Sequence, residues 1–178
     1  MCVTLAPVFL PPQWRRHCGG KKTGARVTHI DRFMQGYQRA WEAGDEHQLA
    51  ALFRADGVYR NTPFAEQRGH AAIMAYWQRT KLQSDVRLRY EILARHEHGG
   101  IAHWHTTYQV TSEELFRTWA ASAGTNLLAR NAGDPLPRLA LDGVAVAEFD
   151  EAGLCREFNI WWHSRIDAPG PQPGGDRP

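Results

Sequence analysis

Tyr59 and Asn61 are the residues whose types and spacing most directly suggest chemistry. They lie two apart in a segment that reads as a strand, and at that spacing both side chains point to one face, roughly 6–7 Å apart. A tyrosine hydroxyl, with an ordinary pKa of about 10, can donate a hydrogen bond to an oxygen that gains negative charge, and an amide can orient a substrate or a water molecule. If their face borders a cavity, the two side chains form the polar floor of a ligand site.

Proton abstraction would need a base from another part of the chain. The candidates are Glu113, Glu114 and Asp134, in a segment that interrupts the strand pattern, and His29 or Asp31 at the start of the first predicted helix. We interpret each of them as a solvated surface charge. These residues are therefore compatible both with a cofactor-free enzyme and with a non-catalytic binding module.

Three helical segments must position these residues. In the first, apolar residues recur at spacings of three and four from Ile30 to Trp41, before Gly44 ends the pattern. Asp45 is placed to cap a short second helix, and Gly69 opens a third. All three lie in the first half of the chain.

The second half reads as strands. From Val86 apolar and polar residues alternate, and a turn at 98–100 leads into a second strand through Tyr108. Residues 112 to 137 break this rhythm, and we interpret them as an inserted, lid-like segment. Two further strands cover 139–149 and 154–163. The order predicts an α+β fold, in which a curved antiparallel sheet forms a cone packed on the three N-terminal helices.

Length, charge and cysteines limit the partners. The 178 residues fit one domain, at 27–166, between a disordered N-terminal extension at 1–26 and a disordered tail at 167–178. The 21 basic and 19 acidic residues are interspersed, so we predict no nucleic-acid partner. No apolar run reaches the roughly 18 residues of a membrane span, so we predict no membrane partner. Three cysteines without a CxxC pair predict reduced thiols and a cytoplasmic location.

Three stretches resemble the nuclear transport factor 2-like superfamily, which holds SnoaL-like polyketide cyclases, ketosteroid isomerases and limonene-epoxide hydrolases. They are residues 37–45 at the end of the first helix, 56–69 at the strand and turn, and 149–153 leading to Trp161 and Trp162. The likeness spans about residues 29 to 165, apart from the insertion. It implies an α+β cone with a deep apolar cavity, in a dimer joined through the outer sheet face.

The resemblance to ketosteroid isomerases is partial. Tyr37 precedes Asp45 by eight residues, as their oxyanion-donating tyrosine precedes its equivalent aspartate, which implies a donor role for Tyr37. Their general base would fall on Asn61 or Thr62, and their protonated acidic partner on Ala145. None of these side chains shuttles a proton as a carboxylate does. We therefore do not expect the isomerase reaction.

The segment YRNTP at 59–63 resembles the Tyr-x-Asn-x-Pro of the epoxide hydrolases, whose tyrosine and asparagine help hold the attacking water. Their Asp-Arg-Asp relay would fall on Tyr108, Thr106 and Ile160, so the resemblance implies a water-holding pair without its base. Both comparisons turn Trp104 and Trp162 toward the cavity.

The same comparisons turn His103 and His105 to the outer face of the sheet. These two residues form an H-x-H pattern, a spacing used by zinc sites, and His163 or Glu148 could supply a third ligand. The competing interpretation is that this face meets a partner subunit, with Trp161 in the interface. We favour the interface and predict a homodimer, no metal and no cofactor.

The expected cavity lining is aromatic and apolar, with several hydroxyls and one amide, a profile typical of a pocket for a flat, weakly polar molecule. The candidate catalytic residues are Tyr37 and Tyr59 as hydrogen-bond donors and Asn61 as the orienting group. The other candidate ligand-binding residues are Phe33, Trp41, Phe64, Trp77, Trp104, Thr106, Tyr108, Phe158 and Trp162.

Three functions remain open. The leading hypothesis is a SnoaL-like protein for a small hydrophobic metabolite, acting as a cofactor-free isomerase, cyclase, dehydratase or hydrolase. The alternative is a non-catalytic ligand-binding or accessory module that forms a dimer. In a third interpretation, the aromatic side chains simply fill the cone as its core.

Overall fold

The computed structural model describes residues 27–62, 64–123 and 133–167. The disordered segments expected at 1–26 and 168–178 lie outside the described residues. Asp167, which we expected in the tail, donates its backbone N–H to the carbonyl of Arg138. None of the helices in these ranges is long and apolar enough to cross a membrane. The cytoplasmic location stays a prediction.

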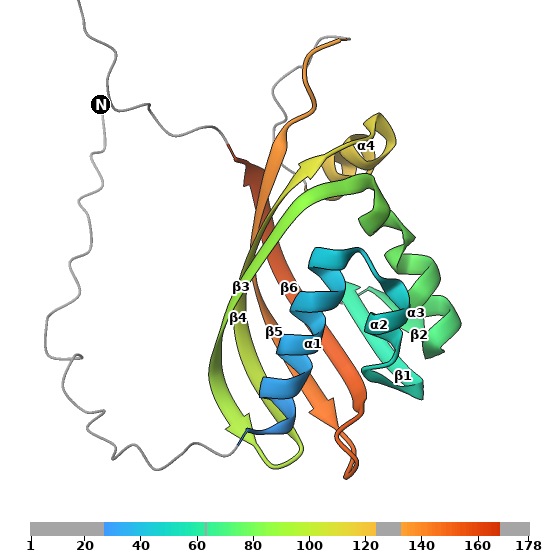
Figure 1. The fold of residues 1–178 in the computed structure, drawn as a ribbon, viewed down its shortest axis with the longest axis vertical. Coiled ribbons are helices and arrows are strands. Elements are labelled where there is room, and N and C mark those ends of the chain that lie inside the picture. Colours follow the sequence, from blue (N-terminus) through green and yellow to red (C-terminus); the bar gives the residue numbers. More distant parts are fainter. Residues whose placement is uncertain (1–26, 63, 124–132, 168–178) are drawn as a thin grey trace, which may run out of the picture.

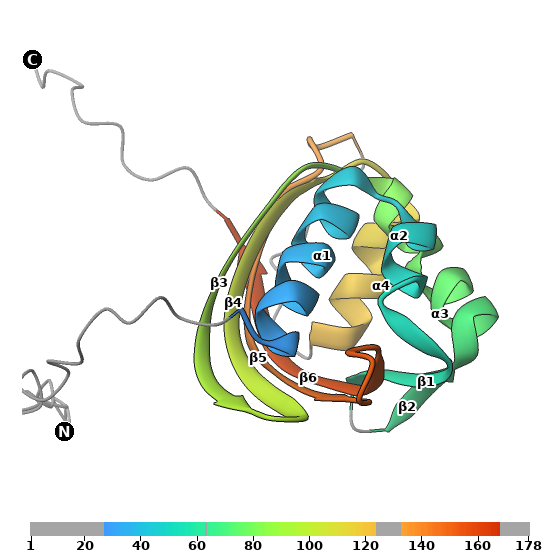
Figure 2. The same ribbon diagram turned by 60° about the horizontal axis from the view of Figure 1, so that its bottom comes forward.

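The described residues form one curved, open sheet with helices on its concave side, which confirms the α+β prediction (Figures 1 and 2). The helices are α1 (His29–Ala43), α2 (Glu46–Ala50), α3 (Gly69–Trp77), the 3₁₀ helix η2 (Gln78–Leu82) and α4 (Glu113–Ala123). The strands are β1 (Phe53–Thr62), β2 (Ala65–Arg68), β3 (Gln83–His96), β4 (Gly99–Val110), β5 (Arg138–Phe149) and β6 (Cys155–Ile166).

The strand order is β2-β1-β6-β5-β4-β3. All neighbours are antiparallel except β1 and β6, which run parallel. The sequence predicted an antiparallel sheet throughout and gave no sign of β2, whose four residues we placed in a turn. β1 precedes the meander of β3, β4, β5 and β6, and the last strand of that meander, β6, pairs with β1. This pairing brings the end of β1 beside the cavity.

Helix α1 is held at both ends by local contacts. At its start, the backbone N–H and the hydroxyl of Thr28 donate to the carboxylate of Asp31 at 3.0 and 2.6 Å. Arg95 of β3 donates to the same carboxylate at 2.8 Å and holds the pKa of Asp31 well below its usual range. Gly44 ends the helix in the left-handed region, at a φ of 63°, where glycine carries no steric penalty. These contacts fix the rotation of α1 and therefore the direction of its aromatic face.

Two glycines let large side chains approach the sheet. A Cβ at Gly100 would lie 2.7 Å from the Cβ of Ile30, so α1 packs directly on the backbone of β4. A Cβ at Gly143 would lie 2.8 Å from Cζ2 of Trp104 and 2.5 Å from the carbonyl oxygen of Trp161. The Trp104 ring therefore rests on bare backbone of β5, and it occupies the middle of the cone.

We expect Gly143→Ala to displace Trp104 and lower the free energy of unfolding by about 1–3 kcal/mol, the usual cost of overpacking a core. Urea denaturation measures this change. Val144→Ala, on the opposite face of the same strand, is the control, with a smaller expected loss. Equal stability of Gly143→Ala and the unmodified protein would contradict this account of the packing.

Candidate functional site

A cavity of about 220 Å³ opens between the concave face of the sheet and the helices. It is smaller than the roughly 300–1,000 Å³ of sites for drug-sized ligands, so it suits a small molecule. Its lining comes from every helix except α2 and from all six strands. The lining residues are Tyr37, Trp41, Tyr59, Asn61, Thr62, Ala65, Gln67, Tyr76, Trp77, Arg79, Thr80, Gln83, Trp104, Tyr108, Leu115, Thr118, Trp119, Leu141, Ile160 and Trp162.

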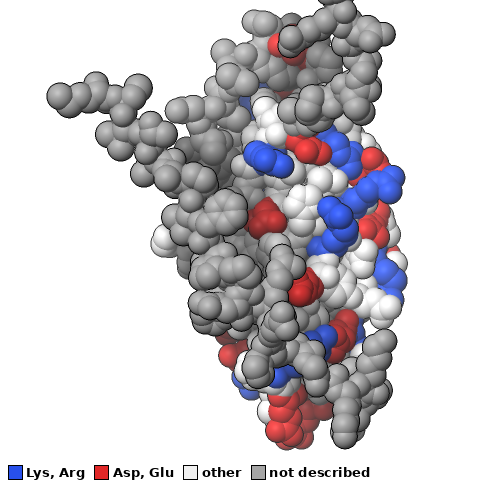
Figure 3. All heavy atoms as spheres, turned by 90° about the vertical axis from the view of Figure 1, so that its left-hand side faces the viewer, with Lys and Arg blue, Asp and Glu red and all other residues white. Residues whose placement is uncertain are grey.

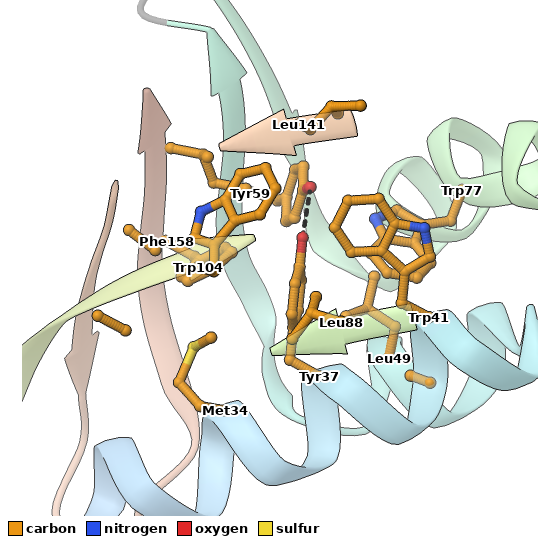
Figure 4. Close-up of a cluster of buried hydrophobic side chains, with 14 of the residues drawn as sticks. Met34, Tyr37, Trp41, Leu49, Tyr59, Trp77, Leu88, Trp104, Leu141 and Phe158 are labelled. Atoms are coloured by element: carbon orange, nitrogen blue, oxygen red, sulfur yellow. Dashed lines mark hydrogen bonds between the residues drawn. The ribbon is translucent and has the colours of Figure 1, made fainter. Parts of the chain in front are cut away.

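Tyr37 and Tyr59 meet at the centre of this region. Tyr37 rises from α1 and Tyr59 faces it from β1, and their hydroxyl oxygens lie 3.4 Å apart, a long hydrogen bond (Figure 4). Both side chains are almost fully buried. Burial raises the pKa of both hydroxyls above the ordinary value for tyrosine. The pair is therefore neutral at physiological pH and can donate hydrogen bonds.

Two further tyrosines extend this group. The ring of Tyr76 lies 5.5 Å from the ring of Tyr59, centroid to centroid. Burial raises the pKa of Tyr76, while the charge of Arg79 and a hydrogen bond with Asn61 oppose that rise. Burial also raises the pKa of Tyr108. Four of the five tyrosines of the chain thus line the cavity as neutral hydroxyls.

Arg79 is the one lining residue among those described that carries a full charge. Its guanidinium carbon lies 3.7 Å from the centroid of the Tyr76 ring, and its Nε donates to the Tyr76 carbonyl oxygen at 2.9 Å. Sequence reasoning missed Arg79, Tyr76 and Gln67. The three-residue spacing from Tyr76 to Arg79, which places both side chains on one helix face, was the available signal. The sequence offered no comparable signal for Gln67, because β2 was not recognised as a strand.

The indole N–H groups around the cavity differ in their partners. Trp41 donates to the side-chain oxygen of Gln83 at 2.8 Å, and Trp162 donates to the backbone carbonyl of Asn61 at 3.1 Å. In contrast, Nε1 of Trp77 and Nε1 of Trp104 are buried and make no hydrogen bond of good geometry with the described residues. The Trp77 N–H lies close enough to the Tyr59 hydroxyl to moderate its raised pKa. Among the described lining residues, the buried side-chain atoms without a partner are thus two donors, these indole N–H groups, and one acceptor, Oε1 of Gln67.

Helix α4 covers the cavity beyond the C-terminal end of α1 (Figure 1). The Ser112 hydroxyl accepts from the backbone N–H of Leu115 at 3.2 Å at the start of the helix. Leu115, Thr118 and Trp119 face the cavity, and the Trp119 indole donates to the hydroxyl of Ser164 on β6 at 2.7 Å. The segment predicted as an insertion at 112–137 therefore contributes a helix to the lining, and its residues 124–132 lie outside the described part.

The structure brings eight of the twelve expected site residues to the cavity. They are Tyr37, Trp41, Tyr59, Asn61, Trp77, Trp104, Tyr108 and Trp162. Phe33 and Phe158 instead pack against each other, 4.9 Å between ring centroids, in the core beside Tyr37. Thr106 is fully buried, and its hydroxyl donates to the carbonyl of Arg87 at 3.1 Å rather than to a ligand.

Phe64 corrects the prediction most clearly. Its side chain is 95% exposed and does not line the cavity. Phe64 lies outside both strands, because β1 ends at Thr62 and β2 begins at Ala65, with which Thr62 pairs. An aromatic residue next to a predicted site motif need not share its face.

The outer face of the sheet carries the histidine pair. Nε2 of His103 lies 2.9 Å from the Asp142 carboxylate on β5. Among the described residues, no three histidine, cysteine or acidic side chains are arranged to hold a metal ion. Where the atoms of the outer face are visible, basic and acidic groups are mixed and form no patch of one sign (Figure 3).

The carboxylates and imidazoles considered as bases do not border the cavity. Asp31 is bound to Arg95, and Nδ1 of His29 is within hydrogen-bond distance of Arg32. Glu113 and Glu114 are exposed on the first turn of α4. The lining that the structure describes thus supplies hydrogen-bond donors, amides and one cation.

Comparison with known proteins identifies the fold independently. The epoxide hydrolase/cyclase-like enzyme SalBIII, studied for pyran ring formation in the polyether salinomycin, is similar in structure, with a TM-score of 0.55. The two chains are 13% identical, over 76% of this chain and 93% of SalBIII, a level at which the likeness concerns the fold alone. No curated protein matches the sequence. The sequence profile of the SnoaL-like domain matches residues 30–158, and the chain belongs to this family.

Proposed function

We propose that the cavity binds a small, largely apolar ring compound that carries a hydrogen-bond-accepting oxygen. The observation that carries this proposal is the pair formed by Tyr37 and Tyr59. Two hydroxyls hold two protons, and only one proton can lie between the two oxygens. The other proton is buried in an aromatic cavity, where a donor without an acceptor costs free energy. A ligand oxygen would accept a hydrogen bond from this second hydroxyl.

The rest of the lining supports the same class of ligand. Indole and phenol rings offer flat apolar surfaces, and ring pairs such as Trp41 and Trp77, 5.8 Å apart, leave edges and faces for a further ring. The unpaired N–H groups of Trp77 and Trp104 add to the donors. A saturated hydrocarbon would fill the space but leave these donors without acceptors.

As an enzyme, the protein would use its hydroxyls to polarise a substrate oxygen. The described lining offers no carboxylate or imidazole, which favours reactions in which the substrate brings its own nucleophile, such as an intramolecular ring closure. Tyr37 and Tyr59 would donate to the oxygen that gains charge, and Asn61 would orient the reacting group. The alternative is that the protein binds the compound through the same contacts and does not convert it.

Acetophenone and ethylbenzene test the hydrogen bond, because they differ chiefly in one carbonyl oxygen. We expect acetophenone to bind more tightly, and Tyr37→Phe or Tyr59→Phe to weaken its binding about three- to tenfold, the value of one hydrogen bond of roughly 1 kcal/mol. Saturation-transfer NMR and calorimetry measure both affinities. Tyr90→Phe, outside the lining, is the matched control and should change neither. Equal affinities for the two compounds would contradict the proposal.

The affinity for acetophenone should not depend on pH between about pH 6 and pH 9. The folded-state pKa values of Tyr37, Tyr59 and Tyr108 are raised above that of free tyrosine, so all three stay protonated over this range. Titration of affinity against pH checks this. A loss of binding that begins below pH 9 would show that a phenol ionises at its ordinary pKa or lower.

We also propose that the outer face of the sheet forms a homodimer. Trp161 on β6 and Leu93 on β3 are 51% and 54% exposed, an unusual exposure for large apolar side chains on a sheet face. His103 and Asp142 lie on the same face and would add polar contacts. A second copy of the chain would cover both apolar side chains at once.

Substitution of Trp161 by glutamate should raise the dimer dissociation constant at least about tenfold, since a buried interface tryptophan commonly contributes 2 kcal/mol or more. Sedimentation velocity over a range of concentrations measures this. Phe64→Glu is the control, because Phe64 is also an exposed aromatic residue but lies between β1 and β2 and not on the strands of the proposed interface. A monomeric unmodified protein at all concentrations would overturn the dimer proposal.

A further inference from the structure

Arg79 places a positive charge where the cavity reaches the surface. It lies in η2, and its side chain both lines the cavity and is exposed to solvent. The stacking on the Tyr76 ring and the bond from Nε to the Tyr76 carbonyl fix the guanidinium plane. In the described ranges no carboxylate lies within ion-pair distance of Arg79, so its terminal nitrogens remain available as donors.

Two other arginines differ from Arg79, because they pair with carboxylates. Arg60 on β1 is paired with both Glu66 and Glu157, and Arg138 on β5 is paired with Asp85. These side chains tie strands and turns together through carboxylates of the chain itself. Arg79 makes its contacts to a ring face and a carbonyl oxygen instead, and both leave its net charge uncompensated.

That charge acts on the interior of the cavity. It lowers the pKa of Tyr59, Tyr76 and Tyr108 against the larger opposite effect of burial. Each of the three hydroxyls therefore feels a positive potential, although they come from β1, α3 and β4. For a negative charge placed among them, the same potential would offset part of the cost of burial, because burial with few polar groups leaves the field weakly screened.

We propose that the ligand of this cavity is an anion, a ring compound whose carboxylate or enolate oxygen lies between Arg79 and the tyrosine hydroxyls. This inference rests on the proposed binding function and narrows its ligand class. A carboxylate only accepts hydrogen bonds, which suits the terminal nitrogens of Arg79, the tyrosine hydroxyls and the unpaired indole N–H groups. The arginine would bind it at the cavity mouth, and the rings deeper inside would hold the apolar body.

The competing explanation is that Arg79 is a solvated surface charge that borders the cavity by chance. An exposed guanidinium can stay hydrated, so its lack of a carboxylate partner carries little cost by itself. The two explanations differ in what they predict for matched ligands. A surface charge without a role in binding would not separate an acid from its amide.

Two pairs of compounds test the anion proposal: benzoate with benzamide, and naphthalene carboxylate with naphthalene carboxamide. The members of each pair are matched in size and shape and differ in charge. We expect each acid to bind the full-length protein about tenfold more tightly than its amide at low ionic strength, as measured by calorimetry. The preference should shrink as sodium chloride is added, because salt screens the ion pair. Binding of the amides should be insensitive to salt.

Variants of Arg79 identify the source of the preference. Arg79→Gln should remove the preference for the acids, because it weakens acid binding much more than amide binding, and Arg79→Lys should restore part of the preference. Arg89→Gln removes the same charge from an exposed position on β3, outside the lining, and should retain the full preference. Thermal unfolding of each variant confirms that it is folded.

Two outcomes would overturn the inference. The first is that acids and amides bind equally, or that Arg79→Gln keeps the preference for the acids. In that case Arg79 does not select an anion, and the proposed binding of a neutral ring compound remains. If neither acids nor amides bind, and acetophenone also fails to bind, the binding function itself is wrong.

Discussion

The close packing of α1 on the curved sheet is the constraint on which the site depends. Ile30 rests on the bare backbone at Gly100, and Phe33 contacts Phe158 one turn further along. These contacts leave no space at the narrow end of the cone. Tyr37 and Trp41 follow on the same helix face, where the sheet curves away, and there the side chains border a hollow instead of filling it. One helical stripe thus supplies both the core and the cavity wall.

The elements of the fold could be predicted because their periodicity is strong. Apolar spacings of three and four identified α1, and alternation identified β4 as a strand. The direction of its side chains came from the resemblance to the isomerases and epoxide hydrolases, which turned Trp104 and Tyr108 toward the concave side. The same resemblance predicted that Thr106 points inward, but it could not tell a core position from a cavity position. That distinction depends on how far the sheet has curved at each residue, and the curvature arises from pairings between distant strands.

The charge at the site was missed at the level of the sequence. Arg79 follows α3 in a short 3₁₀ helix, and a lone arginine after a helix is usually a solvated residue. Its role as a lining residue follows from the path of η2, which returns the chain from α3 to β3 across the cavity. Phe64 is the opposite error, because it was predicted to line the cavity and is instead exposed between β1 and β2. Both errors come from connections, where local periodicity carries no information.

The tryptophans give the cavity an optical consequence. Five of the seven in the chain line it, and the rings of Trp41 lie 5.7–5.8 Å from those of Trp77 and Trp104. Indoles this close couple their electronic transitions, so excitation of one spreads to the others before it is emitted. The near-ultraviolet circular dichroism and intrinsic fluorescence of the whole protein should therefore arise mainly from this single region, and the chain carries a built-in chromophore that reports on whether its interior is filled.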